Sequence, residues 1–186
     1  STHPGEDEAA LDAFITAREA RPDLRLILAP RHPRRAGEVV ALLKARDLGF
    51  AQRSAGQPPA DHPVYLADTM GEMAAWYRLA ALAFVGGSLA DHGGHTPYEP
   101  AREGCAIVHG PHVANQQEAY DRLAAAGAAL RVTSAEELAA AFALLDQPQK
   151  LAALAEAAAA ALPQQDQTRS ATEISDRLAA ILGHRG

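Results

Sequence analysis

The chain has 186 residues, of which 48% are hydrophobic and 22% charged, and it carries a net charge of −6 at pH 7. This composition is typical of one soluble globular domain with a substantial core. The acidic balance argues against a nucleic-acid-binding surface. The single cysteine, Cys105, rules out an internal disulfide and indicates a reducing compartment. No apolar run approaches the roughly 18–20 residues of a membrane span, so we expect a soluble chain.

Strand-like apolar runs alternate with helical patterns along the sequence. Strands are predicted over residues 24–29, 50–53, 64–66, 82–85, 106–109 and 129–132. Helices are predicted over 6–20, from the Pro30–Pro33 loop to about 48, from a cap at Asp68 or Thr69 to 80, after Pro97, over 116–126, over 136–145 with Ser134 as cap, and from Pro148 almost to the end with a break near Pro163. This alternation predicts an α/β fold, a Rossmann-like parallel sheet with helices on both faces, in one domain spanning residues 1–186.

The first five residues, Ser-Thr-His-Pro-Gly, have the composition of a loop that leaves a strand. We therefore expect the chain to begin partway through a larger protein, and its sheet to lack one strand.

A glycine-rich loop follows the strand at 82–85 and contains Gly86, Gly87, Gly93 and Gly94. A strand that runs into such a loop and then a helix is a common anion site, because glycine lets the backbone approach a phosphate and free N–H groups point at it. The spacing is neither the dinucleotide fingerprint nor the P-loop. A nucleotide or sugar-nucleotide site of another kind is the remaining interpretation.

Other polar loops follow strands and should meet at the same edge of a parallel sheet. They include His3 near the start, Arg31 and His32 after the strand at 24–29, and residues 68–72. Arg31 offers a planar fork for phosphate or carboxylate, although a solvated loop arginine is an equally good interpretation. Thr69 to Glu72 and Glu99 fit ligand contacts, but helix capping and a favourable helix dipole explain them too.

Two further chemistries find little support. Five residues, Asp91, His92, His95, His109 and His112, invite a metal site, but they lie in glycine and proline loops without metal-ligand spacing. Ser88 lacks the flanking pattern of a nucleophile elbow. We therefore expect no metal, no cofactor and no hydrolase nucleophile.

Six stretches, read together, resemble the C-terminal half of the 3-deoxy-D-manno-octulosonic acid (Kdo) transferases, which build the inner core of lipopolysaccharide. They are STHPGE, LAPRHPRR, LADTMGEMAAWYRLA, AFVGGSL, GGHTPYEPA and GPHVANQQE, and they span about residues 1 to 130. The resemblance implies the GT-B architecture, two Rossmann-like domains of which the C-terminal one binds the donor CMP-Kdo. It also implies a lipid A precursor as acceptor and, for the full-length protein, the cytoplasmic face of the bacterial inner membrane.

By this resemblance three segments contact CMP. Pro30 and Arg31 form the first, with Arg31 at the phosphate; Met70, Gly71 and Glu72 form the second; the third is Thr96, Pro97, Tyr98 and Glu99, with Glu99 on the ribose. Further cleft residues would be His3, His32, Gly87, Ser88, Gly94 and His95. Thr96 stands where the family usually has Asn, Pro4 where it has Glu, and Tyr98 where it has a smaller aliphatic residue.

The catalytic base remains unassigned, because in the family it belongs to the N-terminal acceptor domain, which we expect to lie outside these residues together with any membrane association. The isolated domain should then bind CMP weakly without catalysing transfer. Two alternatives stay open. One is a GT-B transferase or epimerase that uses a UDP-sugar, and the other is a non-catalytic nucleotide-binding module.

Overall fold

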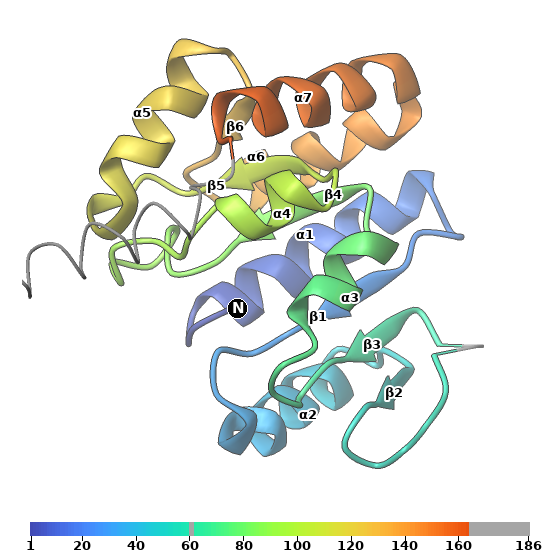
Figure 1. The fold of residues 1–186 in the computed structure, drawn as a ribbon. Coiled ribbons are helices and arrows are strands. Elements are labelled where there is room, and N and C mark those ends of the chain that lie inside the picture. Colours follow the sequence, from blue (N-terminus) through green and yellow to red (C-terminus); the bar gives the residue numbers. More distant parts are fainter. Residues whose placement is uncertain (60–61, 164–186) are drawn as a thin grey trace, which may run out of the picture.

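The computed structural model describes residues 1–59 and 62–163, whose helices and strands are drawn in Figure 1. In this part of the chain, six short strands form two parallel three-stranded sheets in the orders β1-β3-β2 and β4-β5-β6. The strands are β1 Leu26–Leu28, β2 Phe50–Gln52, β3 Val64–Leu66, β4 Leu82–Val85, β5 Ala106–His109 and β6 Ala129–Arg131. The parallel α/β fold predicted from the sequence is confirmed, although β1, β2 and β6 are shorter than predicted.

The helices follow the predicted order. They are α1 Glu6–Ala20, α2 Ala36–Ala45, α3 Met73–Leu79, α4 Tyr98–Arg102, α5 Gln117–Ala125, α6 Ala135–Phe142 and α7 Pro148–Ala161, with short 3₁₀ turns at Pro33–Arg35, Ala114–Gln116 and Ala143–Asp146. The predicted cap of α6 is confirmed, because Ser134 Oγ accepts a hydrogen bond from Glu137 N–H at 3.3 Å. Any helix beyond Pro163 lies outside the described residues. Among those residues, no helix has the length and apolar character needed to cross a bilayer.

The second sheet is covered on both faces. Its central strand β5 is buried along its whole length, and successive side chains point to opposite sides. Val108 packs into a core with α1, α2 and α6, whereas Ile107 packs into a second core with α5 and α7. In the first sheet, Leu66 of β3 joins the core that contains Val108, so α1 and its neighbours connect the two sheets.

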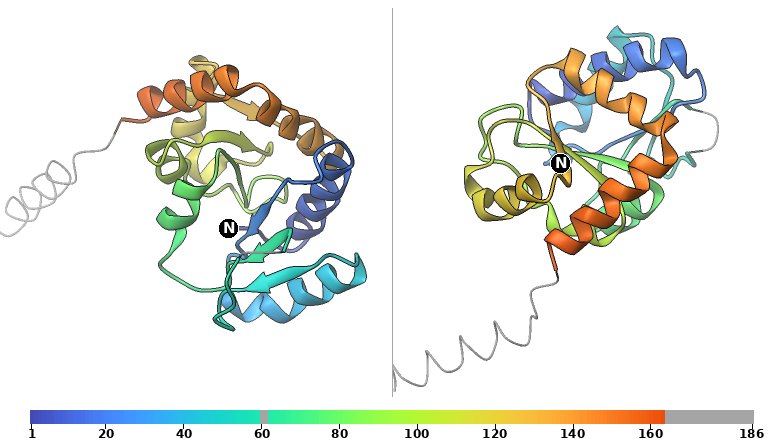
Figure 2. Two further views of the ribbon diagram at one scale, coloured as in Figure 1. Left: turned by 90° about the vertical axis from the view of Figure 1, so that its right-hand side faces the viewer. Right: turned by 90° about the horizontal axis from the view of Figure 1, so that it is seen from above.

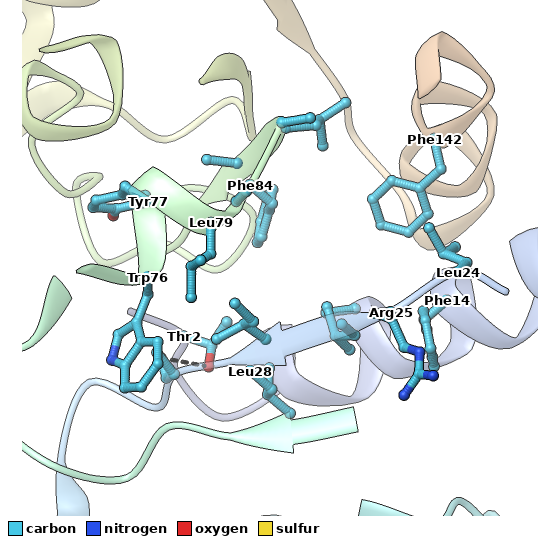
Figure 3. A pocket seen from close by; sticks show the side chains of 18 of the residues that line it. Thr2, Phe14, Leu24, Arg25, Leu28, Trp76, Tyr77, Leu79, Phe84 and Phe142 are labelled. Atoms are coloured by element: carbon cyan, nitrogen blue, oxygen red, sulfur yellow. Dashed lines mark hydrogen bonds between the residues drawn. The ribbon is translucent and has the colours of Figure 1, made fainter. Parts of the chain in front are cut away.

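A cavity of about 280 Å³ separates the facing edges of the two sheets. Figure 3 shows its mostly apolar lining, which includes Leu28 of β1, Phe84 of β4, Trp76 of α3 and Phe142 of α6. Strands β1 and β4 are each an edge strand of their own sheet.

Candidate functional site

The loops after β1 and β4 converge around the start of the chain. Thr2 N–H donates to Ala29 O at 3.0 Å and Arg31 N–H donates to Thr2 O at 2.9 Å, so Thr2 lies beside the end of β1. Gly86 follows β4, and a Cβ atom on it would lie 2.1 Å from the carbonyl oxygen of Ser1. Figure 2 shows the N-terminus between the two sheets. The carboxyl ends of the strands, where ligands bind in parallel sheets, therefore form one edge.

The glycine-rich loop wraps around a carboxylate of the protein itself. Glu6, the first residue of α1, has no exposed surface. Its Oε2 accepts a hydrogen bond from Gly87 N–H at 2.7 Å, and its Oε1 accepts bonds from the next three amides, Ser88 at 2.9 Å, Leu89 at 2.9 Å and Ala90 at 3.3 Å. Such a nest of backbone amides binds an anion, and here the anion is the carboxylate of Glu6. The expectation that these amides are free for a ligand's phosphate is wrong.

The predicted cleft residues of this loop support it from within. Gly87 has φ +70°, and a Cβ atom there would lie 3.2 Å from the ring of His95. Ser88 is fully buried, and its hydroxyl donates to Val85 O at 2.5 Å and accepts from Gly110 N–H at 2.8 Å. Gly94 is buried as well. These residues fix the conformation of the loop, and the absence of a side chain at Gly87 makes room for the His95 ring.

A second buried carboxylate, Asp7, holds the segment that follows β1. Asp7 Oδ2 lies 2.6 Å from Arg35 Nη2, and Asp7 Oδ1 accepts a hydrogen bond from the hydroxyl of Thr2. Burial alone would lower the pKa of Arg35, but the hydrogen bond and charge of Asp7 raise it. Glu6 and Asp7, adjacent in the sequence, thus fix the two loops that carry predicted ligand residues.

The first predicted CMP segment presents a free cation at this edge. Pro30 is buried against Thr2, whereas Arg31 and His32 are exposed. Among the described residues, the Arg31 side chain has no hydrogen-bond or ion-pair partner, unlike Arg35 four residues later. Arg31 can therefore meet an anionic ligand without breaking an internal contact.

The second predicted segment leaves β3 beside the first, because β1 and β3 pair in parallel with Leu28 opposite Leu66. Met70 is 66% exposed and Gly71 is exposed with φ +83°. Glu72 is paired twice with Arg53, whose Nη2 lies 2.8 Å from Oε1, and it also accepts a hydrogen bond from Thr69. These bonds lower the pKa of Glu72.

The predicted cap of α3 is wrong. The helix begins at Met73, and the residue before it makes no side-chain capping bond. Asp68 instead accepts hydrogen bonds from Ser54 N–H and Oγ, at 2.9 and 2.6 Å, and from Gln52 Nε2 at 2.7 Å. Burial would raise the pKa of Asp68, but these bonds lower it overall. Asp68 therefore stabilises the loop after β2.

The third predicted segment opens α4. Thr96 is exposed and Pro97 is buried, while Tyr98 packs against the core of the second sheet. Glu99 is half-buried, and its nearest cation is Arg102, 3.9 Å away. Its carboxylate is therefore loosely held and available to hydroxyl groups.

Three imidazole rings stack between the two loops. We call His3, His92 and His95 the histidine cluster. The ring of His3 stacks on His92 and on His95, with centroids 4.0 and 5.1 Å apart and 19° between the planes in both pairs. The Nε2 atoms of His3 and His95 lie 3.0 Å apart. In residues 1–59 and 62–163, no group of three or more His, Cys, Asp or Glu residues is arranged to hold a metal ion.

The sequence interpretation missed Glu6, Asp7 and Arg35. Acidic residues in the first turn of α1 were visible, but they are also what a helix dipole favours. Their position directly after a loop at the ligand edge was the available signal.

No family model matches the chain. It is 40% identical over 135 residues to the 3-deoxy-D-manno-octulosonic acid transferase of Haemophilus influenzae, an alignment that covers 72% of this chain and 32% of that protein. It is 42% identical over 166 residues to the enzyme of the same name from Bordetella pertussis, covering 86% and 39%. The chain thus spans about a third of the length of these relatives.

The structure is also similar to the C-terminal CMP-Kdo binding domain of WaaA from Acinetobacter baumannii. The TM-score is 0.83 at 35% sequence identity, and the match covers 88% of this chain and 86% of that one. The fold and its loops define a Rossmann-like domain of the kind that forms the C-terminal half of a GT-B glycosyltransferase. The chain belongs to the 3-deoxy-D-manno-octulosonic acid transferase family.

Proposed function

We propose that this chain is the donor-binding domain of a Kdo transferase and that it binds CMP-Kdo through the CMP group. The similar Acinetobacter domain is described as binding CMP-Kdo, and 35% of the residues are identical. The observation that carries the proposal is the exposed side chain of Arg31, which lacks a partner among the described residues. Its backbone is held at the ligand edge by the hydrogen bond from Arg31 N–H to Thr2 O.

Each predicted segment has a distinct role in this proposal. Arg31 binds the phosphate, with Pro30 fixing the backbone before it. Glu99 binds ribose hydroxyls, since only a distant arginine holds its carboxylate. Glu72 acts differently, because its carboxylate is already occupied by Arg53 and Thr69. It would order the turn that presents Met70 and Gly71 to the nucleotide.

Two further members of the third segment, Thr96 and Pro97, place the start of α4 at the ribose, and Tyr98 anchors that helix in the core. The exposed hydroxyl of Thr96 can donate one hydrogen bond to the ligand.

The chemistry follows from the leaving group. The phosphate of CMP gains negative charge as its bond to the sugar breaks, and a fixed guanidinium that meets this charge lowers the barrier. For the whole protein we propose transfer of Kdo to a lipid A precursor in lipopolysaccharide synthesis, at the cytoplasmic face of the inner membrane. We expect the general base outside residues 1–186, so turnover by this chain alone would contradict that part of the proposal.

The test is a binding titration of the 186-residue chain with cytidine, CMP and UDP. We expect CMP to bind more tightly than UDP. Arg31→Ala should weaken CMP binding about tenfold or more, because a charge-assisted bond to phosphate is lost, and should leave cytidine binding unchanged. Arg34→Ala removes an exposed cation from the same segment and serves as the matched control.

The other functions give different results. Tighter binding of UDP than of CMP would indicate a UDP-sugar transferase or epimerase. A wild-type chain that binds none of the three, with Arg31→Ala and Glu99→Ala both silent, would indicate a module without nucleotide binding.

A further inference from the structure

The histidine cluster offers hydrogen-bond donors to a ligand at the same edge as Arg31. Arg31 N–H is bonded to Thr2 O, directly before His3, and the ring of His32 lies edge-on to His3 with centroids 6.4 Å apart. The rings of His3 and His95 are partly exposed and that of His92 is exposed. Solvent and ligands can therefore reach all three rings.

The carboxylates nearest to this cluster are already in contact with other groups: Asp91, next to His92, lies 3.5 Å from His112 Nδ1. From α1 the facing group is Glu6, which is buried and bonded to the glycine-loop amides. From the loop after β1 they are Arg31 and His32. An anion would thus meet the Arg31 guanidinium and imidazole N–H groups other than the one shared between His3 Nε2 and His95 Nε2, together with one fully engaged carboxylate.

Burial and these neighbours favour the neutral forms of His3 and His95 when no ligand is bound. Burial, followed by the charges of the Ser1 amine, His3 and Arg31, lowers the pKa of His95 to about 4. Burial and His92 lower the pKa of His3. A bound anion would reverse this effect, because a nearby negative charge favours the protonated ring.

The chemistry of the proposed donor requires a second anion site. Kdo is a 2-ulosonic acid, so its anomeric carbon carries both the carboxylate and, in CMP-Kdo, the phosphate oxygen. A phosphate held by Arg31 therefore places the carboxylate only a few bonds away. We propose that the histidine cluster is the carboxylate subsite of the donor and that His3 and His95 donate hydrogen bonds to the sugar acid. This inference rests on the proposed binding of CMP-Kdo.

The subsite predicts a proton-linked affinity. Binding the carboxylate raises the pKa of His3 and His95, so the complex takes up protons as it forms. Affinity for the sugar acid should then rise as the pH is lowered below 7, while affinity for uncharged cytidine should not change.

The test uses the 186-residue chain saturated with CMP and titrated with free Kdo or with Kdo methyl ester, which lacks the negative charge. The imidazole proton signals are followed by NMR at pH 7.5 and 6.0. We expect Kdo to bind about tenfold more tightly than the ester and more tightly at pH 6.0. His3→Asn and His95→Asn should each abolish most of this discrimination, whereas His62→Asn, on a remote exposed loop, should preserve it.

Failure of each proposal has its own signature. A wild-type chain that does not bind CMP contradicts the proposed function and this inference with it. A chain that binds CMP but binds Kdo and its ester equally, without pH dependence, overturns the carboxylate subsite alone. The pH dependence of Kdo binding by the wild-type chain tests the carboxylate subsite even if a variant does not fold.

Discussion

The loops after β4 and β1 use their polar groups in opposite ways. The loop after β4 is rich in glycine and its backbone amides are satisfied by buried Glu6. The loop after β1 contains no glycine between Pro30 and Arg35, yet it presents Arg31 to solvent. The composition typical of phosphate binding here belongs to a loop whose amides bind an internal carboxylate, and the cation that we propose to bind the ligand's phosphate lies on the other loop.

The two loops differ in the source of the group that neutralises them: an internal carboxylate for the loop after β4, and an external anion for Arg31 in the loop after β1. A nest of amides attracts any anion of the right size, and a carboxylate on α1 is always present at full effective concentration. An arginine without an internal partner stays available to an external anion. Substitutions at Glu6, which binds the loop after β4, and at Asp7, which holds the loop after β1, therefore test the two loops separately.

The largest effect is expected for Glu6→Gln. The substitution keeps the shape but loses the charge and one acceptor oxygen, so buried amides are left without a partner. We expect the free energy of unfolding in urea to fall by about 3 kcal/mol. Glu8→Gln is the matched control, since Glu8 lies in the same turn but bonds only the exposed Gly5 N–H, at 2.8 Å. Equal stability of the two variants would refute the scaffold role.

Asp7→Asn should have the next largest effect, about 2 kcal/mol, because it weakens the buried pair with Arg35. It should also reduce CMP affinity by a smaller factor than Arg31→Ala, since the turn that follows Arg31 loosens. Denaturation and CMP titration measure the two effects.

Asp12→Asn is the control for that substitution, because its partner Arg46 lies 2.8 Å away at the surface, where Asp12 is 55% exposed. It should cost less than about 1 kcal/mol and leave CMP affinity unchanged. Unchanged stability and affinity in Asp7→Asn would show that the loop after β1 does not depend on α1.

The smallest effect concerns pH. In the unfolded chain His95 has its ordinary pKa of 6.5, whereas in the folded chain the pKa is about 4. Between these values the unfolded chain binds more protons, so the folded state loses stability as the pH falls through this window. His95→Asn should lose less stability between pH 7 and 5 than the wild type. A wild-type slope matched by that of His95→Asn would contradict the shift, and His62→Asn should keep the wild-type slope.

Much of the fold could be predicted because its signals are local. Helix α1 and strands β3, β4 and β5 have the bounds that apolar periodicity predicts. The use of the glycine loop could not be predicted, because Glu6 lies 81 residues away and only the folded chain brings it there. The cap of α3 failed for a similar reason, since Asp68 found stronger partners in Ser54 and Gln52. A polar side chain can bond either to a neighbour in the sequence or to a residue that only the fold brings near, and sequence patterns do not show which of the two it does.

A crystal structure of the chain with CMP tests the central claim most directly. We predict that the phosphate oxygens lie within hydrogen-bond distance of the Arg31 guanidinium while Glu6 keeps its bonds to the amides of Gly87 and Ser88. A phosphate bound to those amides, with Glu6 displaced from them, would contradict the account.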